Sequence, residues 1–109
     1  MDSNQPISEQ FRLAGEAWSD AERAASLMER TRDAVFSDMI GKLLGENIGM
    51  AVNKAEIAAR SSPEYREFVT KMVQMRRDAN LLKVQMEVLR MRFQEWSSHE
   101  ANARAEKRL

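Results

Sequence analysis

Residue types that carry catalysis are few in this chain, and their spacing does not assemble a reactive group. His99 is the only histidine, and Ser97 and Ser98 precede it directly. A nucleophilic serine needs a base within hydrogen-bond reach, but neighbours in sequence on a helix do not face each other. We therefore expect His99 to be a solvated polar residue, and we predict no catalytic residue.

The carboxylates and the missing cysteines argue against a metal site. With no cysteine, the chain can form neither a disulfide nor a thiolate site. Glu22, Glu29 and Asp33 are seven and four residues apart, which places them on one helical face. Di-metal sites in helical bundles combine such carboxylates with a Glu-x-x-His motif, which this sequence lacks. We expect a salt-bridged surface here, and we predict no metal and no cofactor.

A basic set in the C-terminal half is the one feature that could contact nucleic-acid phosphates. Its members are Arg76, Arg77, Lys83, Arg90 and Arg92. Asp78 and Glu87 interrupt the set, and the formal net charge of the whole chain is zero, unlike a general nucleic-acid binder. Arg76, Lys83 and Arg90 are seven apart, the spacing of charges that flank a coiled-coil seam and bridge to a partner helix. Phosphate contact is therefore the alternative interpretation of these residues.

The composition favours an all-α fold that forms one domain. Only four glycines and two prolines interrupt 109 residues that are rich in good helix formers. We predict a flexible N-terminal arm over residues 1–8 and a single helical domain over 9–109. Its helices should cover about 9–44, about 46–60 and about 63–105, and the second is either separate from the first or continuous with it.

An apolar seam runs along the last predicted helix. Ser62 supplies an N-cap, Pro63 a preset φ, and Glu64 a carboxylate near the positive end of the dipole, so this helix should start at Pro63. The seam residues recur three and four apart, as in a heptad repeat, and they are Tyr65, Phe68, Met72, Met75, Ala79, Leu82, Met86, Leu89, Phe93 and Trp96. We predict a long helical hairpin that joins a dimeric helical bundle or coiled coil through this oligomer seam.

A second apolar line on the same helix supports self-association. It consists of Val69, Val73, Leu81, Val84, Val88 and Met91. A two-helix hairpin would leave much of this line in water, so we expect a homodimer or a larger homo-oligomer. The first 47 residues carry five basic and nine acidic side chains, and the remaining residues carry twelve and eight. The two halves would therefore attract each other if they pack antiparallel.

Two features allow more than one interpretation. Gly41, Gly45 and Gly49 recur every four residues, so they would lie on one face of a continuous helix and admit another backbone closely. Alternatively, the helix ends among them, with Gly45 as its C-cap, and the chain turns. Phe93 and Trp96 end the seam, where they either pack in the core or form an aromatic anchor for another protein.

Two stretches carry a resemblance to known proteins. They are Lys54-Ala55-Glu56 running into Ser61-Ser62-Pro63-Glu64-Tyr65, and Arg92-Phe93-Gln94-Glu95-Trp96 followed by Glu100-Ala101-Asn102 and Arg104-Ala105-Glu106. They resemble a group of short, helical, bacteriophage-encoded proteins of undefined role, often found among genes for phage DNA metabolism. The resemblance covers roughly the C-terminal half and does not include the glycine series. It implies a phage or prophage setting beside recombination or replication proteins, and it supplies no catalytic residue.

These observations predict a non-enzymatic helical protein that binds and modulates another protein, such as a nucleic-acid enzyme of the phage or its host. No nucleophile with its base, metal cluster or phosphate loop can be assembled from the sequence. The alternative is a DNA-binding accessory to phage recombination or replication. No signal-peptide-like run or membrane-spanning stretch is apparent, so we expect a cytoplasmic protein, in the host cytoplasm if phage-encoded, without a membrane partner.

Overall fold

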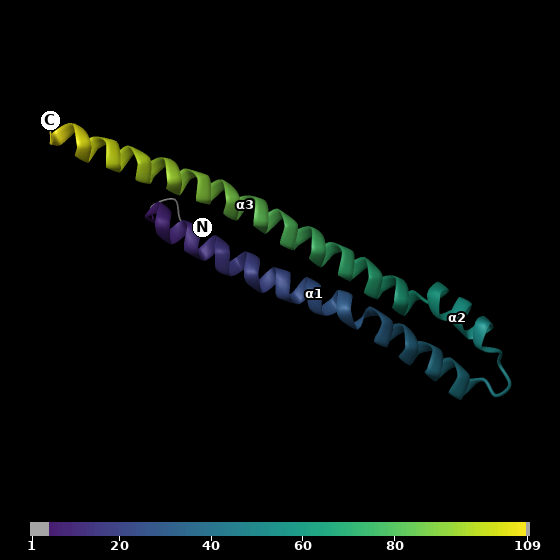
Figure 1. The fold of residues 1–109 in the computed structure, drawn as a ribbon. Coiled ribbons are helices and arrows are strands. Elements are labelled where there is room, and N and C mark those ends of the chain that lie inside the picture. The colour runs from purple at the N-terminus through teal and green to yellow at the C-terminus, as the bar shows by residue number, and fades with distance from the viewer. Residues whose placement is uncertain (1–4, 109) are drawn as a thin grey trace. The chain divides into compact units, whose positions relative to one another are not determined.

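The computed structural model describes residues 5–108 and places three helices there (Figure 1). They are α1 (Ile7–Glu46), α2 (Val52–Ser61) and α3 (Pro63–Lys107). No strand occurs in residues 5–108, so the prediction of an all-α fold is confirmed. No helix in this part of the chain combines the length and the apolar character that a membrane span requires.

The helices are shared between two compact units, where the sequence predicts one helical domain. Unit 1 combines the start of α1, up to Glu22, with α3 from Asp78 onward. Unit 2 is Arg23–Arg77, which contains the rest of α1, all of α2 and the start of α3. Each unit therefore has its own helix pairing.

In unit 2 the α1 and α3 segments run antiparallel. Arg76 bonds to Glu29, whereas the ring of Tyr65, near the start of α3, packs at a tilt against Phe36 with ring centroids 5.2 Å apart. Residues nearer the N-terminus of α3 therefore contact residues nearer the C-terminus of α1. α2 contributes Arg60, whose guanidinium lies over the Phe36 ring, 5.3 Å from its centroid.

Unit 1 has the same antiparallel order. The rings of Phe11 and Phe93 are stacked with centroids 6.2 Å apart. Farther along α1, a Cβ at Gly15 would lie 3.9 Å from the sulfur of Met86, so the two helices approach closely there. The predicted helical hairpin is confirmed, because α1 and α3 segments pair in each unit.

Local chemistry explains where the helices begin. The Ser62 hydroxyl accepts a hydrogen bond from the Tyr65 N–H at 3.2 Å, which caps α3 as the sequence predicts. α1 begins at Ile7, two residues earlier than expected, and the Pro6 carbonyl accepts the N–H groups of Glu9 and Gln10, each at 3.0 Å. Of the predicted arm, residues 1–4 lie outside the described residues.

The glycine series is divided by the end of α1. The helix continues through Gly41 and Gly45, and the chain then turns over residues 47–51 before α2 starts. Gly49 has a φ of +86°, a left-handed conformation that side chains disfavour, so the break occurs there and not at Gly45. A Cβ at Gly41 or Gly45 would meet no atom within 4 Å. The predicted close helix contact at these glycines does not occur in the structure.

Alanine supplies most of the core. The buried apolar residues among those described are Ala14, Ala25, Ala55, Ala59, Met72, Ala79 and Leu89. Only Met72 and Leu89 among them have large side chains, and their exposed fractions are 9% and 6%. Small side chains let helices approach closely but remove little apolar area from water. Each unit is therefore stabilised by a thin core.

Candidate interaction surfaces

The predicted oligomer seam is largely used inside the chain. Nine of its ten residues are buried or half-buried, and Trp96 is the exception. Ring contacts join Phe93 to Phe11 of α1 in unit 1, and Tyr65 to Phe36 of α1 in unit 2. The role of the seam as a contact between copies stays a prediction, since a single chain already covers most of it.

Trp96 ends the seam as an exposed aromatic residue. Its ring stacks on Phe93 with centroids 5.9 Å apart, yet half of the residue, 50%, is accessible to solvent. Tryptophan combines a large contact area with little conformational freedom, which is why it is common at the centres of protein interfaces. The structure therefore separates the two aromatic residues, with Phe93 packed against α1 and Trp96 available on the surface.

The second apolar line of α3 is mostly exposed in the single chain. Val69 is half-buried, whereas the other five residues lie largely in water: Val73 59%, Leu81 52%, Val84 58%, Val88 37% and Met91 52%. A shallow groove of about 300 Å³ lies beside Val84 and Val88 and reaches Gln10 of α1. These exposures agree with the expectation that one hairpin leaves the line wet.

Arg76, one of the predicted phosphate contacts, forms an ion pair within unit 2. Its Nε and Nη2 atoms donate to the two carboxylate oxygens of Glu29, both at 2.8 Å, and Nη2 lies 3.4 Å from the Ser26 hydroxyl. Both side chains are partly exposed, at 29% and 40%. The hydrogen bonds from Arg76 lower the pKa of Glu29 below its usual value. Arg76 therefore fastens α3 to α1 in this unit.

The remaining basic residues do not gather into one patch. Lys83 lies over the ring of Trp18, with its ammonium nitrogen 6.0 Å from the ring centroid. Arg77, Arg90 and Arg92 are exposed. Arg90 and Arg92 are two residues apart, and two residues turn an α-helix by about 200°, so they point to opposite sides of α3. Phosphate binding by this set remains a prediction, with Arg76 and Lys83 already engaged inside the chain.

Two residues of the acidic set of α1, Glu29 and Asp33, form ion pairs. Glu29 is held by Arg76, and Asp33 lies 3.6 Å from Arg32. Glu22 also interacts with other groups, and it belongs to unit 1 while Glu29 and Asp33 belong to unit 2. Among the described residues no three His, Cys, Asp or Glu side chains are grouped closely enough to hold a metal ion.

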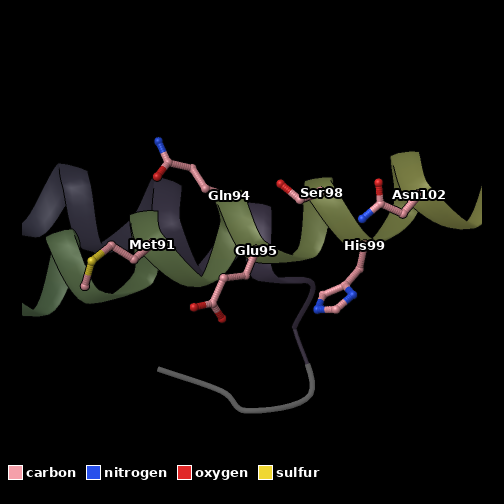
Figure 2. Close-up of a pocket in the computed structure, with 6 residues that line it drawn as sticks. All are labelled: Met91, Gln94, Glu95, Ser98, His99 and Asn102. Atoms are coloured by element: carbon pink, nitrogen blue, oxygen red, sulfur yellow. The ribbon is translucent and has the colours of Figure 1, made fainter.

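His99 lies on a shallow groove of about 400 Å³ that α3 forms alone (Figure 2). The groove is lined by Met91, Gln94, Glu95, Ser98, His99 and Asn102, all of them exposed. Figure 2 shows Ser98 and His99 on opposite sides of the helix. The hydroxyl and the imidazole therefore point away from each other, as neighbouring residues of a helix must.

Large apolar side chains are also exposed around the turn of unit 2. Ile48 is fully exposed at 100%, Val52 is 57% exposed and Ile57 is 67% exposed. Helical spacing alone would group Ile48 and Val52 with the buried residues Ala55 and Ala59. The turn at Gly49 removes Ile48 from that face, and only the small residues pack inward. Sequence reasoning missed this surface, because it depends on where the glycine series breaks.

No family model, curated protein or solved structure matches this chain. The exposed side chains of the two units are therefore the observations from which a function can be inferred. They include ten large apolar residues among those described, in contrast to a core made mainly of alanine.

Proposed function

We propose that the chain is a non-enzymatic helical protein that binds and modulates another protein through its exposed apolar side chains. The observation that supports this most directly is the contrast between the core and the surface. Five of the seven buried apolar residues are alanines, whereas ten large hydrophobic residues are exposed among the residues described. Single exposed apolar residues are ordinary, but several together mark sites of interaction.

The exposed residues of the turn provide the proposed binding surface. Ile48, Val52 and Ile57 fall within ten residues of the chain, in unit 2. Fully burying one such side chain contributes about 1.5–3 kcal/mol, so each of them that a partner covers adds to the affinity. The fitting partner is a protein with an apolar groove or an apolar helix face, because these side chains offer no hydrogen-bonding group.

The resemblance to phage-encoded helical proteins suggests which partner to seek. A small protein that covers part of a nucleic-acid enzyme of the phage or its host modulates that enzyme without any catalytic group of its own. We therefore propose an enzyme of this class as the target. Direct DNA binding is the alternative that the experiment must separate, because it depends on charge and weakens steeply with salt.

The test compares two double variants in capture from a bacterial lysate at high salt. Ile48→Asp with Ile57→Asp adds two charges to the proposed surface, and Ser37→Asp with Thr70→Asp adds two charges at exposed polar positions of the same unit. We expect the wild type and the polar control to retain the same protein and the apolar variant to lose it. Equal retention by all three would contradict the proposed surface.

Light scattering with short DNA at low and high salt completes the test. We expect no complex with DNA at either salt concentration. A DNA complex that dissociates at high salt, together with no retained protein, would favour the DNA-binding alternative and reject the proposal.

A further inference from the structure

Met91 differs in exposure from the other methionines that the structure describes. It is 52% exposed, whereas Met72 is 9% exposed and the remaining methionines in residues 5–108 are half-buried. Phe93, two residues later on α3, stacks on Phe11 of α1, and two residues turn a helix by about 200°. Met91 therefore lies on the side of α3 that faces away from α1.

Met86 of the same helix shows the opposite arrangement. Its sulfur would lie 3.9 Å from a Cβ at Gly15 of α1, so this sulfur belongs to the contact between the two helices of unit 1. Two methionines that are five residues apart on α3 thus place their sulfurs in different surroundings. Met86 provides an internal reference against which the reactivity of Met91 can be compared.

The surroundings of Met91 are polar. It lines the shallow groove of about 400 Å³ on α3 (Figure 2), and the other lining residues are Gln94, Glu95, Ser98, His99 and Asn102. Oxidation turns the apolar thioether of methionine into a polar sulfoxide, and exposed methionines are oxidised more readily than buried ones. A sulfoxide at Met91 stays in contact with water and polar groups. Its formation therefore costs little folding free energy, unlike oxidation of a methionine in a core.

We propose that Met91 is the site at which peroxides modify the folded protein, by conversion to methionine sulfoxide. A lone pair of the sulfur attacks one oxygen of hydrogen peroxide, and the S–O bond forms as the O–O bond breaks. The proton of the attacked oxygen passes to the departing hydroxide, which leaves as water. The sulfur is oxidised by two electrons, which reduce the peroxide. Methionine sulfoxide reductases reverse the change with a dithiol as the reductant.

The modification changes one end of the second apolar line of α3. Met91 is the last residue of that line, and its sulfoxide makes this end polar while the rest of the line stays apolar. The exposed apolar surface of unit 1 thus becomes smaller without unfolding of the helix. The binding surface proposed at the turn belongs to unit 2 and is not altered, so this proposal and the proposed function can each fail alone.

The selectivity is tested by treating the folded full-length chain with dilute hydrogen peroxide and stopping the reaction with free methionine. Cleavage after glutamate releases Met91 in the peptide Val88–Glu95 and Met86 in the peptide Phe68–Glu87, and fragment masses give each oxidation rate. We expect Met91 to react about fivefold faster than Met86 in the folded protein, and the two rates to become equal in concentrated urea. A Met91 rate no higher than that of Met86, or a difference that persists in urea, would overturn the proposal.

The effect on the apolar line is tested with two matched variants. Met91→Leu and Met86→Leu each replace one sulfur by a side chain of similar volume. Hydrophobic interaction chromatography follows the folded proteins after a peroxide exposure that oxidises Met91 in the wild type. We expect the wild type and Met86→Leu to elute earlier than before oxidation, and Met91→Leu to keep its position, all with unchanged helix content. An oxidised wild type that elutes unchanged or loses helix, or a Met91→Leu variant that shifts equally, would overturn this effect.

Discussion

Two leucines of α3 provide a direct test of which face packs against α1. Leu89 is 6% exposed and Leu81 is 52% exposed, so the same change to alanine compares a buried with a solvent-exposed position of one helix. The lost methylene groups and the cavity make Leu89→Ala cost about 3 kcal/mol of unfolding free energy. Leu81→Ala should cost about 1 kcal/mol, because half of the side chain is already in water and no cavity forms.

Urea unfolding at low protein concentration measures this difference. Both tryptophans, Trp18 and Trp96, belong to unit 1 together with the two leucines, so fluorescence follows the unit that the changes affect. With a urea slope of about 1.5 kcal/mol per molar, the two midpoints should differ by roughly 1 M. Circular dichroism on the same samples checks that helix is lost in the same transition.

The reasoning would be refuted if Leu89→Ala cost no more than Leu81→Ala. Such a result would mean that the Leu89 side chain is not buried against α1 in solution.

Three further predictions concern the turn, the ion pair of unit 2 and the C-terminal segment. Gly41→Ala should raise stability in thermal melts by about 1 kcal/mol, because Gly41 is inside a helix with open space around it, whereas Gly49→Ala should lower it by about 1 kcal/mol through its positive φ. The lowered pKa of Glu29 means that its ion pair stabilises the fold above the usual value of 4.5 and is lost as the pH falls through the lowered pKa. Urea midpoints of wild type and Glu29→Gln should thus differ at pH 6 and converge in acid, and a gap that persists there would contradict the pairing. Ending the chain after Trp96 should leave cooperative unfolding intact, because most residues beyond Trp96 are exposed. A thermal melt that is no longer cooperative would show that the removed segment has a structural role.

The parts of the fold that depend on local chemistry could be predicted from the sequence. The start of α3 follows from Ser62, Pro63 and Glu64, whose effects act within one helical turn. The seam follows from its period alone, and nine of its ten residues are indeed buried or half-buried. The position of the break after α1 was not predictable, since three glycines at equal spacing do not show which one adopts a positive φ.

Features that depend on pairing between distant segments were also out of reach. Arg76 is one of five similar basic residues in the sequence, and only the antiparallel register of unit 2 shows that it meets Glu29. The exposure of Ile48 has the same origin, because its helical spacing is regular and only the turn separates it from α2. The candidate surface at Ile48, Val52 and Ile57 could therefore be found only from the structure. The exposed second apolar line of α3 could be found from the sequence and from the structure.

The alanine core determines which substitutions this protein can accumulate. Ala25, Ala55, Ala59 and Ala79 have no exposed area, so any larger residue there forces helices apart. Substitution is therefore restricted at these small buried residues, whereas the large residues on the surface can change together with a partner that they contact. Among homologues of this chain we therefore expect the buried alanines to vary less than the large exposed residues.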